Sequence, residues 1–195
     1  MYTVSRGGYN ARHVKPFVMS KPSGLKNYLF LIVKSAARFY IGEDQFDVAS
    51  GCAIIISPGV PYQYHDLGED YKNDWLYLQS KDPEFETKYG VLMNRPIKLG
   101  NTIQFTQYIQ HILWEKNYAT EKYRNVNVSM LIQTMLNKLL QENELSYPIQ
   151  SYSPYASRLR ELRLMMQSQP SRNYTPEELA NLVGLSSSYF QFLYR

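Results

Sequence analysis

The period of the hydrophobic pattern changes near Pro96, and this change most constrains the fold. Before it, short runs rich in β-branched and aromatic residues are separated by turns that contain glycine and proline, which is typical of strands. After it, apolar residues recur every three to four positions, which is typical of amphipathic helices. The sequence therefore predicts an α+β protein whose strands lie within residues 1–100 and whose helices follow.

Several segments of the first hundred residues predict strands. One continuous apolar run is short enough to be a strand buried on both faces. Two others flank the polar turn at Gly42 and predict a hairpin, and a fourth stops at a turn that contains two prolines and a glycine. Short strands at such regular spacing are typical of a small sandwich or barrel. The segments are 28–33, 39–41, 45–48, 53–56 and 75–78.

Two amphipathic helices are predicted after Pro96, over about 102–118 and 126–142. Each carries an apolar stripe that must be buried against the other helix, the strands or a second subunit. Pairing of two subunits through the region 101–146 and packing of the same stripe against the strands are alternatives that the pattern leaves open. The residues expected in the subunit interface are Leu131, Met135 and Leu139.

The last forty residues predict a separate helical unit. Prolines 148 and 154 mark a linker over 147–155, because residues before proline disfavour the α region. The segment Thr175-Pro176-Glu177-Glu178 is a capping box with proline at the first helical position. Gly184 ends that helix and Ser186 can cap the next. Segment 156–195 therefore predicts a helix–turn–helix, with an ordinary helical hairpin as the alternative.

Polar side chains of the second helix in this motif are the candidate DNA contacts. In a helix–turn–helix the second helix enters the major groove, where glutamine can pair with adenine and arginine with guanine or phosphate. Serine hydroxyls can reach phosphates or base edges. The candidates are Ser187, Ser188, Gln191 and Arg195.

The segment from Glu177 to Phe190 resembles the first helix–turn–helix of the AraC family of bacterial transcription regulators. In that motif, family members share an alanine, then Gly-Leu-Ser, then Tyr-Phe, and this chain has the same order from Ala180 to Phe190. The stretch 51–61 resembles the turn of a cupin barrel, and 74–78 resembles the tryptophan-containing strand of the family's regulatory half. The resemblance spans the chain from Lys21 onwards.

This resemblance implies a fold and a function. It implies a cupin-like, jelly-roll β-barrel over residues 1–100 that senses a ligand, then the helix pair, then a DNA-binding domain. Family members have a second helix–turn–helix that this chain lacks, so 156–195 is expected to be a truncated DNA-binding domain. The implied protein is a homodimeric regulator that binds a small-molecule effector, with a sugar as the expected class, and DNA in its full-length form.

The same resemblance places four residues at positions that hold the sugar in arabinose-sensing members: Lys21, Tyr64, Asn73 and Trp75. Aromatic rings with polar tips suit this role, because they stack on a sugar and donate hydrogen bonds at its edge. Barrel core is the alternative for these rings. The implied mechanism is that the effector changes the packing of an N-terminal arm, from Met1 to about Met19, and thereby biases the DNA-binding halves.

Catalysis is not predicted, and neither a metal nor another cofactor is expected. The chain has no His-x-His pair, its three histidines lie far apart, and one cysteine cannot form a zinc cluster. A cupin-type metalloenzyme, an isomerase or a dioxygenase, and a stand-alone carbohydrate-binding module remain alternatives. The longest apolar run, 29–33, is too short to span a membrane. We therefore expect a cytoplasmic protein with no signal peptide and no membrane partner.

Overall fold

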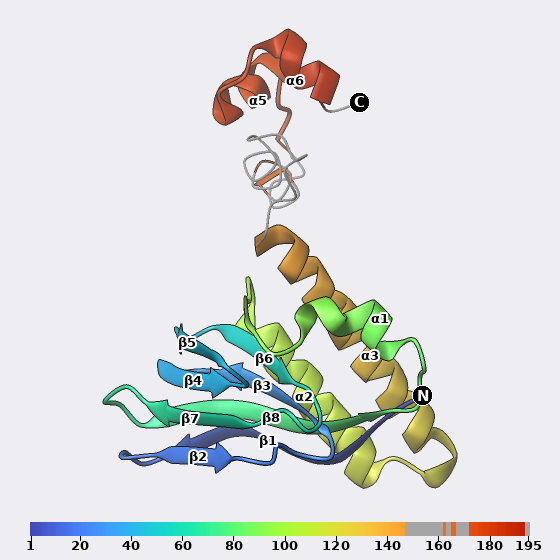
Figure 1. Cartoon of the computed structure of the whole chain (residues 1–195). Helices are drawn as coiled ribbons and strands as arrows, with labels where there is room; N and C mark the ends of the chain where they lie inside the picture. The colour runs from blue at the N-terminus through green and yellow to red at the C-terminus, as the bar shows by residue number, and fades with distance from the viewer. Residues whose placement is uncertain (147–161, 163–164, 167–171, 194–195) are drawn as a thin grey trace. The chain divides into compact units, whose positions relative to one another are not determined.

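The structure is a computed structural model that describes residues 1–146, 162, 165, 166 and 172–193. The chain divides into two compact units, residues 1–147 and residues 148–195 (Figure 1). The predicted linker, 147–155, and most of residues 156–171 lie outside the described residues. None of the helices in the described ranges is both long and apolar enough to cross a membrane.

The described part of the first unit contains two antiparallel sheets. The larger has the strand order β1-β8-β3-β6-β9, and the smaller has the order β2-β7-β4-β5. No strand of one sheet pairs with a strand of the other among these residues, so the expected barrel is an open two-sheet sandwich. The strands are β1 (Tyr2–His13), β2 (Val18–Lys21), β3 (Tyr28–Val33), β4 (Ala37–Ile41), β5 (Asp44–Val48), β6 (Cys52–Ile56), β7 (Tyr62–Asp66), β8 (Tyr71–Ser80) and β9 (Pro96–Lys98).

Strands β3 and β6 are buried on both faces, as the apolar run over 28–33 predicts for β3. Successive side chains of a strand point to opposite faces, so each of these strands contributes to two cores. Leu31 and Ile54 belong to the core between the two sheets, and Ile32 and Ile55 to the core between the larger sheet and the helices. Apolar side chains on both faces explain the layered architecture, because each face of the larger sheet must be covered.

The helices of the first unit are α1 (Phe85–Tyr89), η1 (Gly90–Leu92), α2 (Thr102–Tyr118) and α3 (Glu121–Ser146). Helix α2 has the bounds that the sequence predicts, and the Asn101 side chain caps it by accepting from the Gln104 backbone N–H at 3.1 Å. Helix α3 is longer than the predicted 126–142 at both ends. Both α2 and α3 contribute buried side chains to the core on the helix side of the larger sheet.

The residues expected to form a subunit interface pack against the chain's own sheet. Met135 and Leu139 are fully buried in the helix-side core, and Leu131 is partly buried against it. The alternative, packing of the α3 stripe against the strands, is the arrangement found. Met135 and Leu139 are therefore not exposed to a partner subunit in this structure.

Residues expected to form an N-terminal arm are instead strands of the two sheets. Strand β1 pairs with β8 from Tyr2 to His13, and β2 pairs with β7. The Tyr2 backbone N–H also donates to Ser129 Oγ on α3 at 2.9 Å. Tyr2 and Val4 are buried in the helix-side core and hold β1 in place.

The second unit contains α5 (Pro176–Val183) and α6 (Ser187–Leu193). The capping box is confirmed: Glu178 N–H donates to Thr175 Oγ1 at 3.2 Å, and Thr175 N–H donates to Glu178 Oε2 at 3.0 Å. Gly184 ends α5 with φ of 71°, a left-handed conformation that favours glycine. The Ser186 hydroxyl accepts from Tyr189 N–H at 3.3 Å and caps α6. The two helices and their turn are therefore as predicted.

Candidate functional site

Strand β8 presents two chemically different faces. Tyr71, Trp75 and Tyr77 belong to the core between the sheets, whereas Leu76 and Leu78 belong to the core beneath the helices. By the same alternation, Asn73 lies on the face of Tyr71 and Trp75. The aromatic side chains of β8 and Asn73 therefore gather on the inter-sheet face, which we call the sandwich interior.

Tyrosine rings dominate the sandwich interior. The Tyr64 ring of β7 lies with its centroid 4.7 Å from that of Phe39 and 5.2 Å from that of Tyr71. Phe17 stacks on Tyr71 from the segment between β1 and β2, at 5.3 Å between centroids. Tyr62 stacks with Tyr64 at 6.1 Å. Aromatic rings from both sheets thus pack against one another in the sandwich interior.

Two buried polar atoms in this interior have no hydrogen-bond partner among the described residues: Tyr71 Oη and Asn73 Oδ1. Tyr71 is fully buried and Asn73 is 2% exposed. A buried polar group without a partner destabilises the folded state by about 1–3 kcal/mol. The phenol is a donor and the amide oxygen is an acceptor. Together they fit a ligand group that both accepts and donates, such as a hydroxyl.

Burial also keeps the phenols of the interior neutral. Desolvation raises the pKa of Tyr62, Tyr64 and Tyr71 above the usual value near 10. Neighbouring phenols raise it further, Tyr77 in the case of Tyr62 and Tyr62 in the case of Tyr64. At neutral pH these side chains are therefore hydrogen-bond donors, and they suit an uncharged ligand.

Three of the four sequence-predicted ligand residues come together in the sandwich interior. Tyr64 and Trp75 belong to its cluster of packed side chains, and Asn73 lies on the same face of β8. Lys21 is half-buried at the end of β2, where its backbone pairs with Tyr62. It shares a face of β2 with Met19, which packs against the interior.

Sequence reasoning missed Tyr71 and Phe17. The predicted strand began at residue 75, four positions after the first residue of β8. Extending the alternation backwards from Trp75 would have placed Tyr71 on the interior face. Phe17 gave no such signal, because it lies between two strands that the sequence did not predict.

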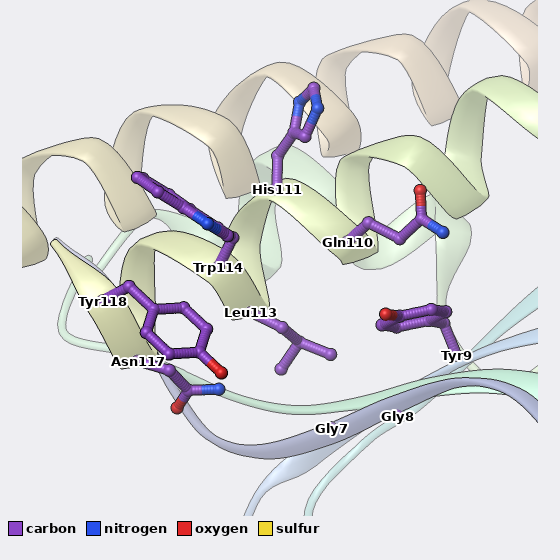
Figure 2. A pocket seen from close by; sticks show the side chains of 9 residues that line it. All are labelled: Gly7, Gly8, Tyr9, Gln110, His111, Leu113, Trp114, Asn117 and Tyr118. Atoms are coloured by element: carbon purple, nitrogen blue, oxygen red, sulfur yellow. The ribbon is translucent and has the colours of Figure 1, made fainter.

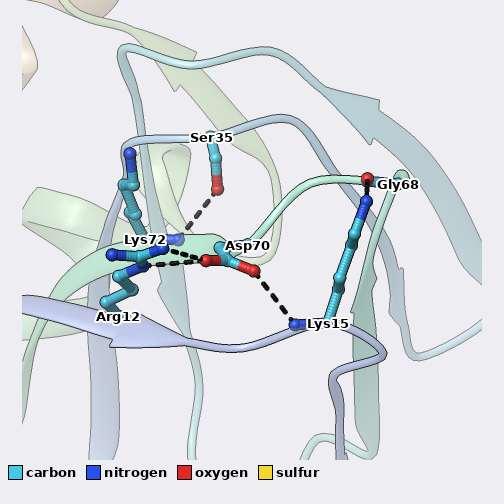
Figure 3. A network of polar contacts seen from close by, with 6 residues as sticks. All are labelled: Arg12, Lys15, Ser35, Gly68, Asp70 and Lys72. Carbon is cyan, nitrogen blue, oxygen red and sulfur yellow. Dashed lines mark hydrogen bonds and ion pairs between the residues drawn. The ribbon is translucent and has the colours of Figure 1, made fainter.

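A polar network fastens one end of the interior (Figure 3). Arg12 of β1 pairs with Asp70, whose carboxylate also accepts from the Lys15 backbone N–H at 3.2 Å. The Lys15 ammonium donates to the Gly68 carbonyl at 2.7 Å. The hydrogen bonds from Arg12 and from the Lys15 backbone lower the pKa of Asp70. These contacts hold the chain that carries Phe17 against the turn that precedes Tyr71.

The opposite face of β8 carries a buried carboxylate that joins several elements. Asp74 is fully buried and pairs with Lys34 Nζ at 2.7 Å. It also accepts from Thr106 Oγ1 of α2 at 2.6 Å and from the Asn10 backbone N–H of β1 at 2.6 Å. Because Asp74 lies between Asn73 and Trp75 in the chain, this junction ties β8 to α2.

The three histidines lie on separate elements. His13 stacks on Phe17 at 4.2 Å between centroids, His65 Nδ1 lies 2.8 Å from the Asp66 carbonyl oxygen, and His111 is on α2. Within the described ranges, no group of three or more His, Cys, Asp or Glu side chains could hold a metal ion.

The candidate DNA contacts lie on α6 or beyond it. Gln191 is exposed and Ser187 is half-buried. Arg195 lies outside the described residues, as does the side chain of Ser188. Behind them, Leu179, Val183 and Phe190 pack in a small core. The unit therefore presents Gln191 on a helix that its own core supports.

No protein-family model matches the chain, and no relative was found among curated proteins. Among solved structures it is similar to the AraC-like transcriptional activator CuxR, with 16% identity over 88% of this chain and a TM-score of 0.45. ToxT from Vibrio cholerae is similar over 96% of this chain and 73% of its own, with 11% identity and a TM-score of 0.45. A cupin domain of Cnp3 from Schizosaccharomyces pombe is similar over 42% of this chain and 56% of its own, with 16% identity and a TM-score of 0.28.

The chain spans only 62% of the length of CuxR. At TM-scores below 0.5, these similarities decide neither the family nor the function of the chain. Both must be argued from the residues of the chain itself.

Proposed function

We propose that the chain is the sensor part, and the beginning of the DNA-binding part, of a ligand-responsive transcription regulator of the AraC type. The observation that carries the proposal is the pair of unpartnered buried atoms, Tyr71 Oη and Asn73 Oδ1, in an aromatic interior. The chain joins this interior to a capped helix–turn–helix. The family motif from Glu177 to Phe190 supports the same conclusion.

The proposed effector is a small uncharged molecule, with a sugar as the expected class. Tyr71 donates to it, Asn73 accepts from it, and the rings of Tyr64 and Trp75 cover its apolar face. Lys21 approaches it from the end of β2. A ligand held by Asn73 and Trp75 acts directly on Asp74 between them, and through Thr106 it acts on α2. In this proposal, effector binding alters α2 rather than an N-terminal arm.

Effector binding is tested with a panel of neutral sugars: arabinose, glucose, galactose, maltose and cellobiose. A sugar that binds only the folded protein raises its melting temperature by mass action. It also changes the emission of Trp75, measured in Trp114→Phe protein, in which Trp75 is the sole tryptophan. If no sugar of the panel changes the melting temperature or the emission of Trp75, the effector is not a sugar of this kind.

The Tyr71→Phe variant tests whether the Tyr71 hydroxyl contacts the ligand or stabilises the fold. Removal of an unpartnered hydroxyl is expected to leave the ligand-free protein as stable as before or more stable by about 1 kcal/mol. The same change weakens effector binding, because the ligand loses a donor. Tyr40→Phe, on the outer side of the smaller sheet and 36% exposed, is the matched control. A large loss of stability in Tyr71→Phe without effector would show that the hydroxyl is structural.

The proposal includes a homodimer, with its interface on the exposed side of α3. Tyr123, Val126 and Met130 are 54%, 56% and 62% exposed, and their spacing places them along one side of the helix. Met130→Glu is expected to convert the dimer into a monomer in sedimentation without lowering the free energy of unfolding of the protomer. A variant that stays dimeric would exclude this side of α3 as the interface.

DNA binding is tested in a longer protein that carries a second helix–turn–helix. There, Gln191→Ala is expected to weaken binding to the preferred sequence by about 1–3 kcal/mol and to relax the preference for one base pair. Fluorescence anisotropy with specific and scrambled duplexes measures both effects. An equal loss of affinity for the two duplexes would indicate that Gln191 contacts the phosphate backbone rather than a base.

A further inference from the structure

We propose a second binding site for a neutral carbohydrate, in a groove between β1 and α2 that is separate from the sandwich interior. The groove has a volume of about 530 Å³, within the range of about 300–1,000 Å³ that small-molecule sites occupy. None of the four residues predicted to hold the effector lines it. We call it the β1–α2 groove. Its lining residues are Gly7, Gly8, Tyr9, Gln110, His111, Leu113, Trp114, Asn117 and Tyr118.

Aromatic rings stand exposed along the β1–α2 groove. Tyr9, Trp114 and Tyr118 are 48%, 57% and 72% exposed. The rings of Trp114 and Tyr118 lie 6.2 Å apart between centroids. Figure 2 shows Tyr118 projecting from α2 toward β1, with Tyr9 on the other side of the groove. Rings with polar tips at both ends of a groove can cover the apolar face of a sugar ring and bond its edge.

The polar groups of the groove are the amides of Gln110 and Asn117, the imidazole of His111 and the phenols of Tyr9 and Tyr118. The amides each offer a donor and an acceptor, as a sugar hydroxyl does. No Asp, Glu, Lys or Arg side chain belongs to the lining. A nucleotide, a phospholipid headgroup or an acidic peptide would therefore find no lysine or arginine there. The lining matches a neutral ligand with many hydroxyl groups.

Glycine shapes the floor of the groove. A Cβ atom on Gly7 would meet Leu76 Cδ2 of β8 most closely, and it would lie 2.9 Å from Leu113 Cδ2 of α2 and 2.9 Å from the Trp75 carbonyl oxygen. Contacts that short force neighbouring atoms apart, so a side chain at Gly7 would disturb the packing of β1 against both β8 and α2. The missing side chain lets the backbone of β1, an edge strand, come close to Leu113 and leaves the space above it open.

The groove and the sandwich interior share β1 as a wall. A Cβ atom on Gly8 would lie 2.8 Å from Trp75 Nε1, so the indole that faces the interior rests against the backbone that lines the groove. The chain has two tryptophans, one at each site. Each site can therefore be followed by its own fluorophore.

The test uses Trp75→Phe protein, whose emission comes from Trp114 alone, titrated with glucose, galactose, maltose and cellobiose. At least one of these sugars is expected to change the emission in a saturable way. Glucuronate, with its negative charge, is expected to bind more weakly than glucose. One result separates the two sites. If a sugar changes the emission of Trp114 in Trp75→Phe protein, and no sugar changes the emission of Trp75 in Trp114→Phe protein, the groove is supported and the proposed effector site is contradicted.

Variants of the otherwise wild-type protein test the same site by calorimetry. Tyr118→Ala and Asn117→Ala are each expected to weaken the affinity for that sugar by about 3- to 10-fold. Tyr40→Ala, which removes an exposed tyrosine of β4 outside the groove, is expected to leave the affinity unchanged.

Three results would overturn the proposal. The first is no response of Trp114 to any neutral sugar, and the second is an affinity that Tyr118→Ala and Tyr40→Ala change equally. The third is saturable binding of a proline-rich decapeptide with no sugar response, because aromatic grooves also receive such peptides.

Discussion

Asp74 connects β1, β8, α2 and the residue that follows β3 through one carboxylate. Its oxygens receive the Lys34 ammonium, the Thr106 hydroxyl and the Asn10 backbone N–H. The side chain is fully buried, so water cannot replace a lost partner. At this residue, a buried charge is compensated by an ion pair and by hydrogen bonds from two other elements.

Asp74→Ala is expected to lower the free energy of unfolding by about 3–5 kcal/mol, because it leaves the Lys34 charge without its partner. Asp47→Ala, which breaks the exposed pair with Arg38, is the matched control and should have little effect. Urea denaturation measures both variants. Similar losses in the two proteins would mean that burial does not set the strength of the Asp74 contacts.

The tyrosines of the interior make stability depend on alkaline pH. Burial raises the pKa of Tyr64 and Tyr71, so above pH 10 the unfolded chain loses protons that the folded chain retains. Their contribution is fully present below the usual phenol pKa and falls as the pH rises above it, by up to about 1.4 kcal/mol per pH unit for each tyrosine.

Unfolding free energies at pH 8 and pH 11 measure this loss. The Tyr64→Phe and Tyr71→Phe double variant is expected to lose less stability over that range than the wild type, since it lacks both phenols. An identical loss in the two proteins would assign the alkaline sensitivity to other groups.

At the scale of elements, α3 shows what an amphipathic pattern determines. The spacing of Leu131, Met135 and Leu139 predicts an apolar face, and the structure has one. The pattern does not say whether a sheet or a partner subunit covers that face. The sequence contains no further signal that could decide, because both covers require the same apolar side chains.

Two methionines lie on different sides of α3, Met135 on the covered side and Met130 on the exposed side. Met135→Ala is expected to cost about 2–5 kcal/mol of unfolding free energy, because it leaves a cavity in the core. Met130→Ala is expected to change stability by less than about 0.5 kcal/mol at a protein concentration where the chain is monomeric. A large loss for Met130→Ala would indicate that this side chain is buried in solution.

The fold could be predicted where local chemistry decides it. The strands over 28–33 and 53–56, the hairpin around Gly42 and the helix over 102–118 all have strong periodicity or a cap. Strand β1 was missed because the Gly7-Gly8 pair and the bulges along its pairing with β8 interrupt the alternation.

The candidate ligand residues Tyr64, Asn73 and Trp75 were predicted from resemblance to a family, and they lie in one interior. Tyr71 can be found by extending the alternation of β8 backwards from Trp75. The β1–α2 groove could not be found this way, because it depends on how segments distant in sequence approach each other, which no local pattern encodes.

At the scale of the whole molecule, the described residues of the two units belong to separate hydrophobic cores. The two cores of the first unit contain only residues from Tyr2 to Leu140. The core of the second unit contains Leu162 and residues from Tyr174 to Phe190. Each unit therefore buries its own apolar surface.

A fragment of residues 1–147 is accordingly expected to fold by itself, with a melting temperature within a few degrees of the first unit in the whole chain. Differential scanning calorimetry of both proteins makes the comparison. A fragment that melts far earlier would reveal stabilising contacts from the second unit.

The pairing of β1 has a consequence for the order in which the protein is made. Tyr2 leaves the ribosome long before Ser129, yet its backbone N–H donates to the hydroxyl of that residue, 127 positions later. The strand that β1 pairs with, β8, is also synthesised after it. Closing such long loops is slow, because the entropy is lost before the contacts form. During synthesis β1 must therefore wait, with Tyr2 and Val4 open to chaperones, until α3 has emerged.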